Sequence, residues 1–188
     1  ALGGHGLLAV APHALDRALV MPRTPDRVVF DAAAGPVRVR RERGPDGRVA
    51  RARLAGAPSF VVAAGVDLSV LGRGLRADVA YGGAFYAIVD AESAGVSVSG
   101  LHVGSLQRAG LAIASAVDAA MDLTHPGTGE VLPLGGVLLT APPRSEGAAL
   151  QSVVVRRHGG VERSPSGTGT AALMAVLDAM GLLAEDVP

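Results

Sequence analysis

The chain has 188 residues, of which 49% are hydrophobic, and its formal net charge at pH 7 is zero. This length and composition predict a globular protein with one domain or two small ones. Cysteine and lysine are both absent, which excludes disulfides, thiolate chemistry, a Schiff-base lysine and the lysine of a P-loop. Zero net charge argues against bulk attraction to nucleic acid or to an anionic membrane.

The first predicted element is a helix after a glycine-rich start. Residues 7–20 have helical character, but Pro12 cannot donate the backbone hydrogen bond of a regular helix. We therefore expect a short helix that is kinked or ends near Ala11, with Ala14 to Val20 continuing it.

A β-hairpin is predicted next. Residues 28–30 and 36–41 are typical of strands, and Gly44-Pro45-Asp46-Gly47 is a strong turn signal that makes 48–54 the returning strand. Alternation places four arginines on one face of the hairpin, namely Arg38, Arg40, Arg51 and Arg53. This face could bind phosphate or simply be solvated, and we favour the solvated face because no aromatic residue is interleaved with the arginines.

In the middle of the chain, the sequence pattern predicts strands over residues 65–103, with a bend at Tyr81-Gly82-Gly83 and a buried strand over residues 85–89. Glycines at the bend allow a close backbone approach, either to a packed helix or to a substrate. Residues 105–123 give the longest predicted helix. Further strands are predicted at 137–140 and 151–157.

The stretch Ser164-Pro165-Ser166-Gly167-Thr168-Gly169-Thr170 is followed by an apolar run, 171–183. A tight glycine-rich turn that opens a helix directs unpaired backbone N–H groups and the positive end of the helix dipole at one point, which favours an anion. Gly3-Gly4-His5-Gly6 has a related arrangement before another apolar run. The two turns predict facing helix N-termini that hold one small carboxylate.

Four motifs resemble the proline racemase family. Residues 162–170, Glu-Arg-Ser-Pro-Ser-Gly-Thr-Gly-Thr, resemble its Asp-Arg-Ser-Pro-Cys-Gly-Thr-Gly-Thr signature, and Leu2-Gly3-Gly4-His5-Gly6 is similar to its Met-Cys-Gly-His-Gly signature. Residues 78–87 resemble its Asp-Val-Ala-Tyr-Gly-Gly-Asn-Phe-Tyr-Ala run. Thr124-His125-Pro126, with residues 136–143, also fits in order.

The resemblance implies an α/β fold of the α+β type, like that of diaminopimelate epimerase. It has two pseudo-symmetric domains, each a curved, mostly antiparallel sheet around a central helix, with the ligand in the cleft between them. We expect residues 1–62 to form the first domain and 63–188 the second. Because family members are longer, we expect the first to be incomplete at its N-terminus and the second at its C-terminus.

The resemblance also implies the site. The two catalytic positions correspond to Gly3, which offers no side chain, and Ser166, where racemases of the family carry Cys. Glu162 stands where the family has an Asp that binds the substrate's ammonium group. The family's carboxylate cradle would consist of the backbone N–H groups of Gly4, His5, Gly167 and Thr168.

Two of these residues have alternative interpretations. Glu162 could be a surface carboxylate paired with Arg163 or Arg157. His5 could substitute as a base, because an imidazole titrates near neutral pH, or it could be structural. Phe60, Tyr81, Phe85 and Tyr86 could wall a pyrrolidine ring, and spacing alone does not select among them.

Two functions stay open. The first is a cofactor-independent enzyme that abstracts the α-proton of proline or hydroxyproline, as a hydroxyproline epimerase or a trans-3-hydroxy-L-proline dehydratase, and hence an isomerase or a lyase. The second is a catalytically silent member that binds a small amino-acid carboxylate without turnover. We expect a cytoplasmic protein with a small-molecule ligand and no metal, nucleic acid or membrane partner, and leave a homodimer open.

Overall fold

The computed structural model describes residues 4–24, 26–32, 35–56, 58–98, 102–162 and 164–183, without the side chains of His5, Ala32 and Gly35. The chain divides into two units, Ala1–Ala57 and Pro58–Pro188, called unit 1 and unit 2 below. The division expected between residues 62 and 63 falls inside a strand of unit 2.

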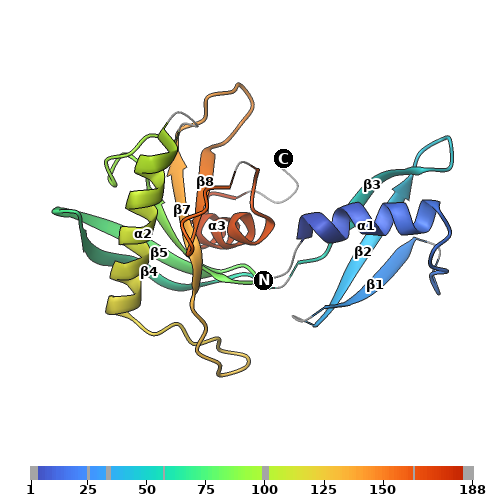
Figure 1. Cartoon of the computed structure of the whole chain (residues 1–188), viewed down its shortest axis with the longest axis horizontal. Helices are drawn as coiled ribbons and strands as arrows, with labels where there is room; N and C mark the ends of the chain where they lie inside the picture. Colours follow the sequence, from blue (N-terminus) through green and yellow to red (C-terminus); the bar gives the residue numbers. More distant parts are fainter. Residues whose placement is uncertain are drawn as a thin grey trace. The chain divides into compact units, whose positions relative to one another are not determined.

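Unit 1 is a helix on a three-stranded antiparallel sheet (Figure 1). Helix α1 (Gly4–Asp16) lies against strands β2 (Gly35–Arg43) and β3 (Val49–Leu54), and β1 (Arg27–Ala32) forms the other edge. The predicted hairpin is confirmed. The Gly44 N–H donates to the Arg48 carbonyl at 2.8 Å, and Gly47 takes the positive φ of 77° that this turn requires.

The first helix differs from its prediction. It continues through Pro12 and ends at Asp16, so the alternative in which the helix ends near Ala11 is wrong, as is the continuation to Val20. Ala18 adopts a left-handed conformation, with φ of 52°, and the Leu19 N–H donates to the Ala14 carbonyl at 2.8 Å. This is a helix-terminating turn of the kind that glycine usually provides.

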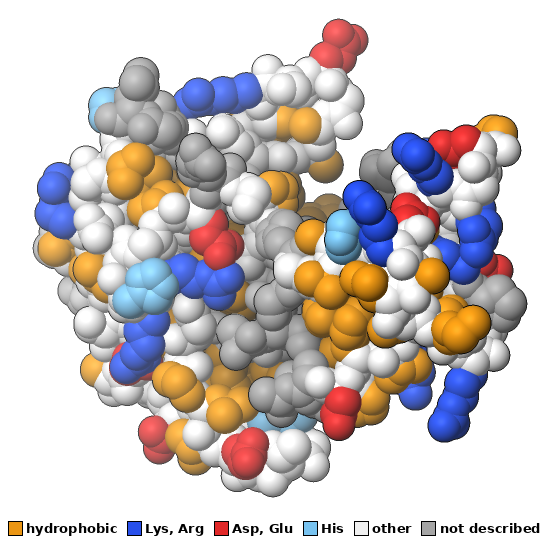
Figure 2. Space-filling model, turned by 45° about the vertical axis from the view of Figure 1, so that its right-hand side comes forward, with side chains coloured by type: hydrophobic (Ala, Val, Ile, Leu, Met, Phe, Trp, Pro, Cys, Tyr) orange, Lys and Arg blue, Asp and Glu red, His pale blue; other side chains and the backbone are white. Residues whose placement is uncertain are grey.

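The alternation on the hairpin is confirmed for β2 and for residues 51–54 of β3, whereas Ala50 is exposed beside Arg51. Val37 and Val39 are buried, whereas the four arginines of the opposite face are exposed. Blue arginine side chains are visible on the surface of unit 1 in Figure 2.

Unit 2 is a five-stranded sheet in the order β4-β5-β6-β7-β8. Its strands are β4 (Phe60–Val70), β5 (Arg73–Tyr81), β6 (Phe85–Asp90), β7 (Leu134–Ala141) and β8 (Gln151–Arg156). All neighbours are antiparallel except β6 and β7. That parallel pair needs a crossover, and α2 (Val103–Ala120) lies within the connection between the two strands.

Each face of this sheet is covered by a helix. Phe85 and Val89 of β6 pack in the same apolar cluster as α2, whereas Tyr86 and Ile88 pack with α3 (Gly167–Ala179). Because successive side chains of a strand point to opposite faces, a strand buried on both sides is an unbroken apolar run. The predicted buried strand at 85–89 is confirmed, as are the two helices of this unit. Among the described residues, no helix has the length and apolar character needed to cross a membrane.

Candidate ligand-binding site

The first turn of α3 carries the candidate site. Ser166 is the N-cap residue, with extended backbone angles, and its Oγ accepts a hydrogen bond from the Gly169 N–H at 3.3 Å. The Ser166 carbonyl accepts from the Thr170 N–H at 2.7 Å. The N–H groups of Gly167 and Thr168 therefore remain free of intrahelical partners. Apart from the chain neighbours and the backbone of α3 itself, no heavy atom of a described residue lies within 4 Å of the position that a Cβ on Gly167 would take, so the space beside this residue is open.

Gly82 holds the turn between β5 and β6 against the same helical turn. A Cβ placed on Gly82 would lie 2.2 Å from the Thr168 carbonyl oxygen and 2.5 Å from the Ala172 nitrogen. Of the two roles considered for Gly82, the close approach to a packed helix is therefore the one observed. The absence of a side chain at this position fixes how α3 begins relative to the sheet.

A hydrogen-bonded chain joins β6, β8 and α3. The Tyr86 hydroxyl lies 2.7 Å from Thr168 Oγ1, and Arg156 Nη1 donates to the Tyr86 oxygen at 3.0 Å. Because that oxygen accepts from the guanidinium, its own proton is available to Thr168. Arg156 Nε donates to Glu162 Oε1 at 2.7 Å, and Nη2 contacts the same oxygen. The chain connects the candidate carboxylate to the first turn of the helix.

Strand alternation explains the pairing of Glu162. Val154 packs on the α3 side of the sheet and Val155 on the α2 side. Arg156 therefore emerges on the α3 side, where it meets Glu162, whereas Arg157 pairs with Asp118 of α2 at 2.7 Å. The ion pair between Glu162 and Arg157 considered from the sequence is wrong, and Arg163 lies outside the described residues.

One carboxylate oxygen of Glu162 accepts a hydrogen bond from Arg156, and the other has no hydrogen-bond partner among the described residues. Its side chain is 25% exposed, but Oε2 is buried and has no hydrogen-bond partner among the described residues. A buried acceptor left without a donor destabilises the folded state by about 1–3 kcal/mol. Such exceptions are few in native proteins and often mark a functional group.

Comparison with known proteins identifies the family. The proline racemase family model matches residues 1–187. The chain belongs to the proline racemase family. It is 35% identical over 182 residues to a 4-hydroxyproline 2-epimerase from Paracoccus denitrificans and 32% identical to a 4-hydroxyproline epimerase from Brucella ovis. Each alignment covers 96% of this chain and 54% of the relative, so the chain spans about half the length of these curated relatives.

Solved structures show the same fold. A probable proline racemase from Agrobacterium radiobacter, with bound carbonate, has a TM-score of 0.82 at 28% identity. A hydroxyproline epimerase from Agrobacterium vitis, with bound trans-4-hydroxy-L-proline, has a TM-score of 0.81 at 26% identity. The matches cover 96% of this chain and 53% and 52% of those chains, respectively. The predicted mixed α/β fold of the proline racemase family is thus confirmed.

The other predicted half of the family site lies in unit 1. Gly4 is the first residue of α1, and apart from its chain neighbours and the helix's own backbone no described residue has a heavy atom within 4 Å of the position of a Cβ there. His5 follows in the same helix, but its side chain is outside the described part of the structure. Gly3, the position of the family's first catalytic residue, also lies outside the described residues.

Of the four aromatic residues considered as walls of a ring-binding site, three pack away from α3. Phe60 and Tyr81 stack with ring centroids 5.1 Å apart, and His125 contacts Tyr81 edge-on at 4.7 Å. Phe85 joins this group on the α2 side of the sheet. Tyr86 alone of the four lies on the α3 side, and the period-two pattern of β6 could have distinguished it from Phe85.

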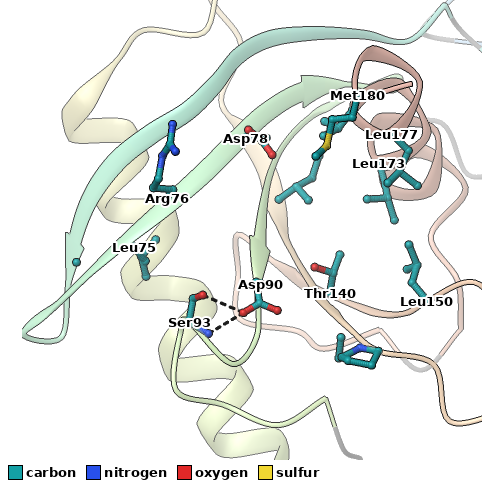
Figure 3. A pocket seen from close by; sticks show the side chains of 15 residues that line it. Leu75, Arg76, Asp78, Asp90, Ser93, Thr140, Leu150, Leu173, Leu177 and Met180 are labelled. Atoms are coloured by element: carbon teal, nitrogen blue, oxygen red, sulfur yellow. Dashed lines mark hydrogen bonds between the residues drawn. The ribbon is translucent and has the colours of Figure 1, made fainter. Parts of the chain in front are cut away.

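A cavity lies elsewhere in unit 2. It has a volume of about 670 Å³ and is lined by Leu173 and Leu177 of α3 and by Met180 just after the helix, together with residues of β5, β6 and β7 (Figure 3). Its polar side chains are bonded locally. The Asp90 carboxylate accepts from Ser93, and the Thr140 hydroxyl donates to a backbone carbonyl. The cavity borders the C-terminal half of α3, away from the helix start that carries the family motif. No cluster of His, Asp and Glu suited to a metal ion occurs among the described residues.

Proposed function

We propose that this chain binds a small ring acid of the proline type at the first turn of α3. The observation that carries the proposal is the open helix start, where the N–H groups of Gly167 and Thr168 have no partner among the described residues. Backbone donors and the positive end of the helix favour a carboxylate at this point. These donors do not depend on the side chain at position 166.

The family supports the choice of ligand. The relatives are hydroxyproline epimerases by name, and one structural neighbour holds trans-4-hydroxy-L-proline. The motif around Glu162 and Ser166 matches the part of the family pattern that surrounds the ligand. We therefore infer a five-membered ring that bears a carboxylate, with Glu162 beside the ring nitrogen position.

The chemistry at position 166 favours binding without two-base proton exchange. Ser166 is 5% exposed, and its oxygen accepts the capping hydrogen bond of α3. A serine hydroxyl needs an adjacent base before it can remove an α-proton. No histidine or carboxylate among the described residues accepts a hydrogen bond from it. Gly3, at the position of the family's first catalytic residue, has no side chain.

Turnover is the second candidate function, and the names of the relatives favour it. Of the two reactions, dehydration of trans-3-hydroxy-L-proline depends less on a side chain at position 3, because it needs one base and a leaving hydroxyl group. Epimerisation of 4-hydroxyproline needs a proton donor and an acceptor on opposite faces. His5 would have to take part, or water would have to enter the space at Gly3.

Proton NMR in heavy water separates these functions. L-proline, trans-4-hydroxy-L-proline and trans-3-hydroxy-L-proline are each incubated with the chain, together with tetrahydrofuran-2-carboxylate as a ring acid that has no amine. The proposal predicts ligand line broadening while the α-proton signals of the amino acids persist. Loss of an α-proton signal, or conversion of the 3-hydroxy compound, would establish turnover. Absence of broadening for every compound would overturn the binding proposal.

A further inference from the structure

The two units carry opposite formal charges. Unit 1 has ten arginines and five acidic residues, which gives it a formal charge of +5. Unit 2 has seven arginines and twelve acidic residues, which gives it −5. The zero net charge of the whole chain is therefore the sum of two segregated charges, and a basic part beside an acidic part is typical of chains that bind a polyanion through the basic part.

The positive charge of unit 1 is concentrated on one face of its sheet. The other face is covered by α1, and the buried residues Val37 and Val39 of β2 lie on it. Because successive side chains of a strand point to opposite faces, their neighbours in β2 point away from α1. The uncovered face carries five exposed arginines from three strands and is called the arginine face below: Arg27, Arg38, Arg40, Arg51 and Arg53.

Three of these arginines lie directly opposite one another. Arg27 of β1 is in register with Arg40 of β2, and Arg40 is in register with Arg53 of β3. Directly opposite residues of an antiparallel pair have Cβ atoms about 4.5–5.5 Å apart, and like charges in these positions destabilise the sheet. An anion bound across the row would relieve this repulsion.

Most of the arginine face has no counter-charge within the chain. Two acidic residues, Asp31 and Glu42, share the face, and Glu42 forms an ion pair with Arg53 at 2.9 Å. The arginines without an ion pair or side-chain hydrogen bond among the described residues are Arg27, Arg38, Arg40 and Arg51. Each guanidinium offers a planar fork of donors that matches phosphate oxygens. Of the two roles considered from the sequence, phosphate binding is the one that these contacts favour.

The residue types on the arginine face select the kind of partner. An open sheet face does not enclose a ligand, so the partner has to contact several guanidinium groups at once. Among the described residues of this face, none is aromatic and could stack on a base, and none is a Ser, Thr, Asn or Gln that could recognise a ribose 2′-OH. Duplex DNA supplies one negative charge per about 1.7 Å of helix axis and can be bound through its backbone alone.

A second copy of the chain is a less suitable partner. The exposed acidic residues of unit 2 belong to different elements, such as Asp67 in β4, Asp118 in α2 and Asp178 in α3. Two of these three already form ion pairs, with Arg76 and Arg157. Acidic side chains that are spread in this way match one compact basic face poorly.

We propose that the arginine face of unit 1 binds the phosphate backbone of duplex DNA without reading its sequence. The four arginines that have no partner supply four phosphate contacts. Neutralising each phosphate releases counterions, so the logarithm of the affinity falls with the logarithm of the salt concentration with a slope of about −3.6 for four contacts. The inference does not depend on ligand binding at α3, and either proposal can fail without the other.

Fluorescence anisotropy with a labelled DNA duplex tests the inference on the full chain. The duplex has about 20 base pairs, and the dissociation constant is measured between about 50 and 200 mM salt. We expect the constant to rise about 100-fold over this range, as a slope of about −3.6 requires. A second duplex of unrelated sequence should bind with the same affinity, because backbone contacts carry no sequence information.

Paired variants separate the arginine face from the overall charge of the chain. Arg27→Gln combined with Arg40→Gln removes two contacts and should reduce the slope to about −1.8, with binding at least about tenfold weaker at about 100 mM salt. Arg27→Lys combined with Arg40→Lys keeps both charges and should keep the slope. Arg108→Gln combined with Arg144→Gln is the matched control, because it removes two exposed charges from unit 2 and should leave the slope unchanged. Circular dichroism checks that each variant is folded.

Four results would overturn the inference. The first is an absence of duplex binding at about 50 mM salt. The second is an equal loss of slope in the unit 2 control, which would make the effect one of overall charge. The third is binding to phosphatidylserine vesicles but not to the duplex, which would make the partner a membrane surface. The fourth is self-association without DNA that the Arg27→Gln and Arg40→Gln changes abolish, seen by analytical ultracentrifugation, which would assign the face to a second copy.

Discussion

Replacing Gly82 with alanine should displace the first turn of α3. The added Cβ would lie 2.2 Å from the Thr168 carbonyl oxygen and 3.0 Å from the Ala171 carbonyl carbon. Because carbon–oxygen contacts are normally about 3.3 Å or longer, the turn and the helix must separate by about 1 Å. Overpacking of this kind costs about 1–3 kcal/mol, and we expect the upper end because the contacted atoms are backbone. A loss of ~3 kcal/mol corresponds to a fall in Tm of about 6–12 °C.

Tyrosine fluorescence during urea unfolding reports this change selectively. The chain has two tyrosines and no tryptophan, and both tyrosines, Tyr81 and Tyr86, belong to unit 2. Gly74→Ala in β5 is the control, since no described residue other than its chain neighbours lies within 4 Å of its Cβ position, and it should not destabilise the unit. A Gly82→Ala variant within about 0.5 kcal/mol of the parent would refute the close approach of the turn to α3.

Three other substitutions test the packing around the site by the same unfolding assay. Ser166→Ala removes the N-cap of α3 and should cost about 1 kcal/mol, whereas a cost near zero would contradict the capping role. Gly110→Ala would place a Cβ 2.5 Å from Val155 Cβ and should destabilise the packing of α2 by about 1–3 kcal/mol. Tyr86→Phe leaves its two hydrogen-bond partners unpaired and should cost about 1–3 kcal/mol, and an unchanged stability would show that the bonds contribute nothing.

Local signals in the sequence were sufficient to predict several structural elements. Ser166 precedes a glycine-rich turn and an apolar run, and the structure starts α3 at the next residue with this serine as its cap. Residues 85–89 are uniformly apolar because both faces of β6 are covered by helices. The turn at 44–47 contains glycine and proline where the backbone reverses.

Features that depend on long-range packing were not predictable in the same way. The end of α1 is set by a left-handed alanine, Ala18, where composition favours further helix. The partner of Glu162 depends on which of two adjacent arginines faces α3, and that depends on the register of β8. Tyr86 and Thr168 are far apart in sequence, so their hydrogen bond follows only from the completed fold.

Backbone amide chemical shifts test the central claim that a ring carboxylate binds at the start of α3. The ¹⁵N-labelled chain is titrated with (S)-tetrahydrofuran-2-carboxylate and the amide signals are followed by NMR. We predict that the largest shifts occur at Gly167 and Thr168, whose N–H groups are the proposed donors. Shifts concentrated instead around Leu177 and Met180, beside the cavity at the other end of the helix, would contradict it.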